Sequence, residues 1–362
     1  MPHKLPGAPR ARTWISFRTI ACCLFTLALA QGLRAASADA GYAVVDRWPL
    51  GAAGGWDYLT FDAPRHRLFV ARSDRVEVID VRSGRVAATI PGTDGVHGVA
   101  IAEDLKRGFT SNGRSDSITV FDLDKLSVLR TVAVPGHNPD AILYEPRYRR
   151  LFTFNGRSKD ATVFDADTLK VLASLPMPDK PEFAVTDGKG GVYVNIESEQ
   201  GQLLSIDAQR PSVRAIWPMP GCESPTGLAI DRARQRLFST CANRTLAVTD
   251  AISGRQIARV EIGLGPDAAI YDEGSGTVFS ANGEGTLSAI REASPGVYVS
   301  AQAATRRGAR TLALDPDSRR IYLVTSDFST AGPATADNPH PRPQPVAGTA
   351  VVLVVQSNRS AN

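Results

Sequence analysis

The 362-residue sequence has few cysteines, no long apolar run and no helical pattern. It contains four cysteines, and its longest apolar run, residues 19–33, is too short to span a bilayer comfortably. Elsewhere, no stretch of useful length repeats apolar residues with the period of about 3.6 residues that marks an amphipathic helix. Hydrophobic residues still make up 43% of the chain, enough to bury a substantial core. The sequence therefore predicts a globular protein built from short strands and turns.

Several signatures of catalysis are absent as well. The chain has no HExxH zinc motif, no GxSxG nucleophile elbow, no P-loop and no CxxCH haem-attachment motif. His97 and His137 are expected on neighbouring loops of one face, but no third histidine joins them, which argues against a closed zinc site. The motifs alone therefore select no class of reaction.

The net charge of +4 does not indicate nucleic-acid binding, because it comes from the N-terminal segment. Residues 1–38 contain five basic residues and no acidic one. The rest of the chain carries 36 basic and 37 acidic side chains, so it is close to neutral. We therefore expect no nucleic-acid partner.

Residues 1–38 have the pattern of a secretory signal peptide. Basic residues precede the apolar run, and Ala36-Ser37-Ala38 supplies the small residues of a cleavage site. We predict cleavage after Ala38 and export, so that the mature protein is periplasmic or secreted and has no membrane span. The alternative is that the apolar run remains as an uncut membrane anchor.

A unit of apolar run, charged turn and aromatic residue recurs along the rest of the chain. The aromatics that mark it lie 40 to 45 residues apart, at Phe69, Phe109, Phe152, Tyr193, Phe238, Phe279 and Tyr322. Each unit holds four short strand signals separated by Pro, Gly, Asp and Asn. Such units are typical of propeller blades. We therefore predict an all-β protein in which residues 39–362 form a single seven-bladed β-propeller of four-stranded blades.

The two ends of the repeat region complement each other. The seventh unit stops after its third strand, whereas Tyr42–Leu50 precedes the first unit and resembles the outer strand of unit four. We expect this N-terminal strand to complete blade seven, because it would then cover a free sheet edge. Residues 328–348 are proline-rich and are predicted to form a surface loop inserted in blade seven.

The run RLFVARSDRVEVIDVRSGRVAATIPGT and its six echoes resemble the YVTN repeat of YncE-type bacterial propellers. The resemblance extends over residues 42–356 and implies a secreted or periplasmic propeller, without implying one reaction. More distantly, such propellers resemble the heavy subunits of some amine dehydrogenases and the lactonase propellers. This sequence departs from the repeat at Arg72-Ser73, which replaces the usual Asn, and at Arg291, where the first five units have Asp.

Alignment of the repeats predicts which side chains surround the mouth of the central channel, the usual binding face of a propeller. One position at the start of each inner strand gives the candidate ligand-binding residues Asp57, His97, Asp140, Glu182, Thr226, Asp267 and Arg310. The alignment leaves Glu182 open to a shift of one residue. The acids and His97 could hold a divalent cation or pair an acid with a base. The alternative is a repeated turn device in which the carboxylates accept backbone N–H groups.

Arg310 and His97 depart from the acidic repeat and are the stronger functional candidates. Arg310 is either a counter-charge for Asp57 or Asp267, or an anchor for a ligand carboxylate or phosphate. Trp56 either stacks on a ligand or fills space between blades. Asparagines at or just beyond the second strands are interpreted as turn residues rather than ligand contacts: Asn112, Asn155, Asn195, Asn243 and Asn282.

The mature chain would keep Cys222 and Cys241, an even pair in an oxidising compartment. Cys222 lies in the loop before blade five, and Cys241 ends the second strand of that blade. Pairing Asp231 with Arg236 in the hairpin between them places Cys241 opposite Thr226, with Cys222 just above. We predict a Cys222–Cys241 disulfide, with two free buried thiols as the alternative.

Binding and catalysis both remain open as functions. The leading hypothesis is a monomeric periplasmic protein that binds a small molecule or a protein partner, or serves as a scaffold, through its channel mouth. The alternative is a metal-assisted enzyme of lactonase or lyase type, with a divalent cation in the mouth and acidic residues as ligands or general base. A further alternative is an accessory subunit of a periplasmic dehydrogenase.

Overall fold

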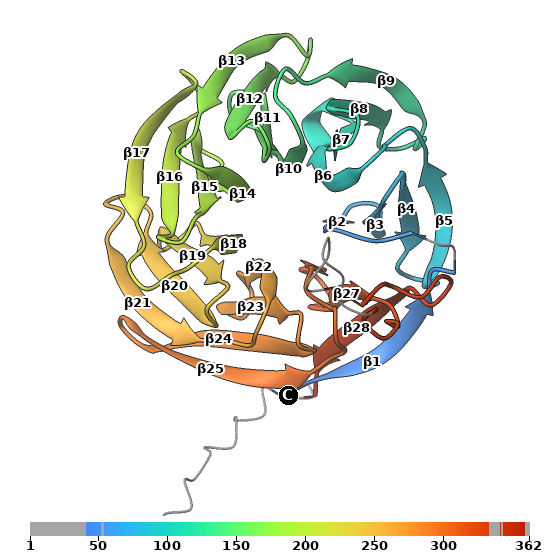
Figure 1. The fold of residues 1–362 in the computed structure, drawn as a ribbon, viewed down its shortest axis with the longest axis vertical. Coiled ribbons are helices and arrows are strands. Elements are labelled where there is room, and N and C mark those ends of the chain that lie inside the picture. The colour runs from blue at the N-terminus through green and yellow to red at the C-terminus, as the bar shows by residue number, and fades with distance from the viewer. Residues whose placement is uncertain (1–40, 52–53, 333–340, 342, 359–362) are drawn as a thin grey trace, which may run out of the picture. The chain divides into compact units, whose positions relative to one another are not determined.

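The computed structural model describes residues 41–51, 54–332, 341 and 343–358, and the predicted signal peptide lies outside them. The described residues form seven four-stranded antiparallel sheets around a common centre, so the all-β, seven-bladed propeller is confirmed (Figure 1). The one helical segment among them is the 3₁₀ turn η1 (Glu103–Leu105). No helix in this part of the chain has the length and hydropathy that crossing a membrane requires.

Six blades are each built from four consecutive strands that run in order from the channel to the rim (Figure 1). Blades one to three contain β2 (Leu59–Asp62), β3 (Arg67–Arg72), β4 (Arg75–Asp80), β5 (Arg85–Ile90), β6 (Val96–Ala102), β7 (Arg107–Asn112), β8 (Ser117–Asp122), β9 (Val128–Ala133), β10 (Pro139–Glu145), β11 (Arg150–Asn155), β12 (Asp160–Asp165) and β13 (Val171–Pro176). Blades four to six contain β14 (Lys180–Thr186), β15 (Gly191–Glu197), β16 (Gln202–Asp207), β17 (Ser212–Pro218), β18 (Pro225–Asp231), β19 (Arg236–Cys241), β20 (Thr245–Asp250), β21 (Gln256–Glu261), β22 (Pro266–Asp272), β23 (Thr277–Asn282), β24 (Thr286–Ser294) and β25 (Val297–Ala304).

The remaining sheet combines strands from distant parts of the chain. It contains β26 (Leu312–Leu314), β27 (Ile321–Thr325), β28 (Val351–Ser357) and β1 (Tyr42–Pro49), which pairs antiparallel with β28. The segment between β27 and β28 includes the proline-rich residues, of which 333–340 and 342 lie outside the described part. Its described ends meet at a bridge between Phe328 and Pro345.

The aromatic residues that mark the repeats form the centres of the cores between blades. They are at most 5% exposed: Phe69, Phe109, Phe152, Tyr193, Phe238, Phe279 and Tyr322. Phe69 of blade one, for example, contacts Phe121 of blade two, with 5.6 Å between ring centroids. Burying each such side chain contributes roughly 1.5–3 kcal/mol, so the repeat that revealed the fold also supplies much of its stability.

The aspartates that end the third strands hold turns on the face opposite the mouth. Asp122 and Asp165, for example, accept the backbone N–H groups of Lys125 and Thr168. Blade six has Arg291 at this position, and β24 and β25 continue past it to a tight turn at Ser294–Val297. The loss of the turn residue therefore lengthens the outer hairpin without breaking the blade.

Most of the asparagines interpreted as turn residues also have a second structural role, through their side chains. The amide groups of Asn112, Asn155 and Asn282 are buried inside their blades and donate to side chains of the third strand. The side-chain amide of Asn195 donates to the carbonyl oxygens of residues 226 and 227, which links blade four to blade five. The side chain of Asn243 holds the loop at Gly221–Glu223. The backbone carbonyl oxygens of Asn155 and Asn282 accept N–H groups in the turns that follow them, as a turn residue does. All five contacts are structural.

In blade one, a buried ion pair takes the place of the asparagine. Arg72 is fully buried and donates to Glu77 across 3.1 Å, where blade two pairs Asn112 with Thr119. The Arg72 guanidinium also donates to the carbonyl oxygens of Gly55 and Gly54 at 3.0 and 3.3 Å. Arg72 therefore fixes the segment that leads into the first inner strand.

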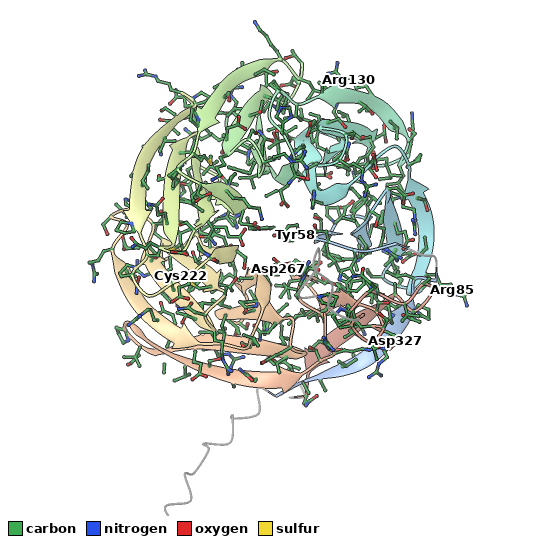
Figure 2. All side chains as sticks on the ribbon, in the orientation of Figure 1. Tyr58, Arg85, Arg130, Cys222, Asp267 and Asp327 are labelled. Carbon is green, nitrogen blue, oxygen red and sulfur yellow. A yellow bond between two sulfur atoms is a disulfide. The ribbon has the colours of Figure 1, made fainter. Side chains whose placement is uncertain are left out.

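The disulfide between Cys222 and Cys241 is confirmed, with a Cα–Cα distance of 5.3 Å. Asp231 pairs with Arg236 as predicted, but a bulge between Pro225 and Leu228 shifts the register, so that Cys241 lies opposite Pro225 instead of Thr226. Both cysteines are buried. Figure 2 shows Cys222 among the strands of blades four and five.

A variant with Cys222→Ser and Cys241→Ser is expected to lose about 3 kcal/mol of unfolding free energy, because the bridge closes a loop across 19 positions. Urea titrations of the two proteins without reductant measure the difference. Thiol titration of the unfolded, unreduced protein expressed without residues 1–38 should find no free cysteine. Two reactive thiols per chain would contradict the bridge.

Candidate functional site

The seven candidate residues occupy equivalent positions at the starts of the inner strands. An equivalent proline lies opposite the last or second-last residue of the next strand in four blades, and a bulge follows each one: Pro139, Pro181, Pro225 and Pro266. The residue after each proline is therefore equivalent in the four blades. This register gives Glu182 the same place in blade four as Asp140 has in blade three, with no shift.

His97 lies between two of the predicted carboxylates. Its Nδ1 atom is 2.6 Å from Oδ2 of Asp57 and 3.6 Å from Oδ1 of Asp140. Burial alone would lower the pKa of His97, but the hydrogen bond with Asp57 and the charge of Asp140 raise it to about 9. In turn, burial raises the pKa of Asp140, and the charge of His97 opposes that rise. Blades one, two and three therefore meet in one charged group.

Glu182 belongs to a second charged group. The sequence analysis predicted Glu182 but not its partners Lys180 and Glu197. The ammonium group of Lys180 bonds to Glu182 and, across 2.7 Å, to Glu197. Burial raises the pKa of Glu182, the charge of Asp140 adds to the rise, and Lys180 opposes it. Lys180 and Glu197 face each other at the ends of β14 and β15. A search for charges on both strands at the mouth, and not only on the inner strand, would have found them.

Asp267 and Arg310 form the third group. The Nε atom of Arg310 is 3.0 Å from Oδ2 of Asp267, so Arg310 contacts one of its two expected partners. Burial raises the pKa of Asp267 to about 7, against the charge of Arg310 and with the charges of Asp57 and Asp140 adding to the rise. The Arg310 side chain is 52% exposed, which leaves it accessible from solvent.

Thr226 does not join these charged groups. Its hydroxyl donates to the carbonyl oxygen of Pro266 across 3.0 Å and thereby links blades five and six. Among the described residues, each of the four mouth carboxylates contacts a basic side chain, and none of the four accepts a backbone N–H: Asp57, Asp140, Glu182 and Asp267. These carboxylates therefore differ from the alternative considered above, in which they would accept backbone N–H groups in a repeated turn.

Tyr58 lies at the centre of the mouth, although the repeat alignment did not select it. Figure 2 shows Tyr58 and Asp267 toward the middle of the ring. Tyr58 is 6% exposed and its ring contacts Phe183, with centroids 4.9 Å apart. Burial raises its pKa, and so do the charges of the four mouth carboxylates. Blades two, three, five and six have Gly or Ala at this position. A large residue where most blades have a small one is the sequence feature that could have identified Tyr58 as a mouth residue.

Two cavities adjoin this centre. One, of about 340 Å³, lies beside Asp57 and His97 and is also lined by Trp56, Arg114 and Arg157. The other, of about 590 Å³, begins at Tyr58 and Phe183 and follows the inner strands of the channel. The first cavity therefore gives a small molecule access to the group around His97.

The wall of the smaller cavity is continuous with the inserted segment of blade seven. Trp56 contacts Phe328, with 6.0 Å between ring centroids, and the Arg307 guanidinium lies 5.7 Å from the centre of the Phe328 ring. Trp56 thus packs between chain segments at the mouth, one of the two roles considered for it.

His137, the other histidine expected on this face, forms a separate pair. Its Nδ1 atom is 2.8 Å from Oδ2 of Asp116, and its side chain is 63% exposed. No third metal-ligating side chain joins this pair among the described residues.

Comparison with known proteins supports the fold and assigns no activity. The sequence matches no family model and no curated protein. A chain in the crystal structure of a mitotic checkpoint complex is similar with a TM-score of 0.64 and 15% identity, over 94% of this chain and 99% of that chain. A chain of hydrazine synthase from Kuenenia stuttgartiensis has a TM-score of 0.48 and 13% identity, over 70% of this chain and 97% of that chain. At such identities the similarity to the checkpoint chain is one of fold, and this chain is a seven-bladed β-propeller.

Proposed function

We propose that this protein is an exported binding propeller that holds a small, positively charged ligand in its channel mouth. The observation that carries the proposal is the excess of carboxylates around Tyr58. The acidic groups are Asp57, Asp140, Glu182, Glu197 and Asp267, against the basic groups His97, Lys180 and Arg310. Burial and mutual repulsion raise the pKa values of Asp140, Glu182 and Asp267, and a bound cation would replace their protons and stabilise the carboxylates.

Export is part of this proposal. The N-terminal sequence has the pattern of a secretory leader, and one disulfide joins the only cysteines that follow it. We further infer that the protein is a YncE-type propeller, because its sequence contains seven copies of a unit that resembles the YVTN repeat. That resemblance is compatible with a binding role and implies no reaction.

Calorimetric titration of the purified protein tests the proposed ligand charge. Probes should include 1,4-diaminobutane, divalent metal chlorides and succinate, which has four carbons like the diamine but the opposite charge. At least one cation should bind, and succinate should not. A Glu182→Gln, Asp267→Asn variant should bind that cation at least tenfold more weakly, or about 1.4 kcal/mol.

Asp124→Asn is the matched control, because Asp124 is a 60% exposed carboxylate that pairs with Arg65 outside the mouth. It should bind the cation as the wild type does. Tighter binding of succinate than of every cation, or unchanged binding by the mouth variant, would overturn the proposal.

A metal-assisted hydrolase or lyase is a second candidate, favoured by the convergence of Asp57, His97 and Asp140. In such an enzyme these residues would hold a cation, and the adjacent cavity would admit the substrate. Hydrolysis of a simple lactone by the metal-loaded protein, absent from a His97→Gln variant, would distinguish this candidate from binding alone.

A further inference from the structure

We propose that Asp57, His97 and Asp140 bind one divalent cation of the Zn²⁺ or Mn²⁺ type, a proposal that rests on the cationic ligand proposed above and names it. One ligand atom from each side chain lies within 4.8 Å of the others. These three residues form the only group of this kind in the described part of the chain. The next paragraphs call them the Asp–His–Asp group.

The backbone of each member of the Asp–His–Asp group is held by a neighbouring blade. The Thr311 hydroxyl donates to the carbonyl oxygen of Asp57 across 2.9 Å, and the Tyr58 N–H donates to that of His97 across 3.1 Å. The Ser111 hydroxyl donates to the carbonyl oxygen of Asp140. Because three rigid blades present the side chains, the site is preorganised rather than assembled from mobile loops.

The donor atoms indicate which cation fits. One imidazole nitrogen with two carboxylates is a mixed nitrogen and oxygen set, which suits Zn²⁺ and Mn²⁺. Ca²⁺ and Mg²⁺ prefer oxygen ligands alone. Three protein ligands leave coordination positions open, and the cavity of about 340 Å³ reaches both Asp57 and His97 from solvent. A cation held here would therefore be accessible to a second molecule.

Metal binding to the purified protein, stripped with a chelator and dialysed, tests the site directly. Titration with Zn²⁺ or Mn²⁺ should give one ion per chain by calorimetry and by elemental analysis, and Ca²⁺ should bind at least tenfold more weakly. Asp140→Asn and His97→Gln should each weaken Zn²⁺ or Mn²⁺ binding by at least about 100-fold, since each removes a ligand.

The protein contains its own control. His137 and Asp116 form another histidine–aspartate pair, at 2.8 Å, without a third ligand. His137→Gln should therefore bind metal as the wild type does. If His97→Gln does not fold, pulsed EPR of Mn²⁺-loaded wild-type protein should still detect coupling to one imidazole nitrogen.

Each contrary outcome overturns a defined claim. Loss of binding in His137→Gln but not in His97→Gln, tighter binding of Ca²⁺, or Mn²⁺ without nitrogen coupling would overturn the metal site. Binding of 1,4-diaminobutane without any metal would overturn the metal site and leave the proposed function standing. Failure of every cation to bind would overturn both.

Discussion

Replacing Arg72 by methionine is expected to lower the free energy of unfolding by about 3–5 kcal/mol. Arg72 is fully buried, and its guanidinium serves Glu77 and the carbonyl oxygens of Gly54 and Gly55. Methionine fills part of the volume but donates no hydrogen bond, so the buried Glu77 carboxylate loses one of its two arginine partners and keeps Arg75. The part-buried carbonyl oxygens of Gly54 and Gly55 lose the Arg72 donor as well. Urea unfolding of the two proteins at pH 7 measures the difference.

Two further variants show where the loss comes from. Arg85→Ala removes an arginine at the outer rim, visible in Figure 2, and should change the free energy of unfolding by no more than about 0.5 kcal/mol. Arg72→Asn with Glu77→Thr imitates the Asn112–Thr119 contact of blade two and should be more stable than Arg72→Asn alone. If Arg72→Met unfolds at the same urea concentration as Arg85→Ala, the buried pair contributes nothing to stability.

Replacing Asp267 by asparagine is expected to stabilise the protein at alkaline pH relative to the wild type. Burial raises the pKa of Asp267 from 3.8 to about 7, so the folded protein binds the proton more tightly than the unfolded chain does. Folding stability of the wild type should therefore fall as pH rises from about 4 to above 7. Between pH 5 and pH 8, this one group should cost about 2–3 kcal/mol that Asp267→Asn avoids.

Urea titrations of wild type and variant at pH 5 and pH 8 test this expectation, because other titrating groups cancel in the difference. The variant also loses the ion pair with Arg310, which forms only where Asp267 is ionised. The pKa of about 7 already includes this attraction, and the pair is weak because Arg310 is half exposed. Asp124→Asn, at an exposed site, should show no change in the difference between pH 5 and pH 8. A difference for Asp267→Asn that is constant with pH, or that favours the wild type more at pH 8, would contradict a raised pKa at Asp267.

The blades could be predicted from the sequence because each one is a local structure. Its strands follow one another within about 40–45 residues, and its marker aromatic, such as Phe152, recurs where an interblade core must be filled. The disulfide could be predicted for the same reason, since a single hairpin separates Cys222 from Cys241. The equivalence of Asp57, Asp140 and Asp267 also followed from the repeat, because equal positions in equal blades share one face.

Local pattern was not sufficient where a bulge or a buried polar contact intervened. The bulge after Pro225 moved Cys241 by one partner. A bulge follows proline at this position in four blades, but the sequence analysis did not interpret these prolines as bulge residues. Asn112 was interpreted as a turn residue because Asn-Gly favours turns, yet its side chain points into the blade and bonds to Thr119. Both outcomes depend on how one strand lies on the next.

Sequence alone determined the all-β repeat, the number of blades, the cysteine pair and the ring of candidate positions at the mouth. Tertiary structure decided which of these side chains meet across blades: His97 with Asp57 and Asp140, and Arg310 with Asp267. It also brought Tyr58 to their centre. The physical reason is that hydrogen bonding within a blade is local in the chain, whereas charges from blades about 40 residues apart interact only after the ring has brought them together.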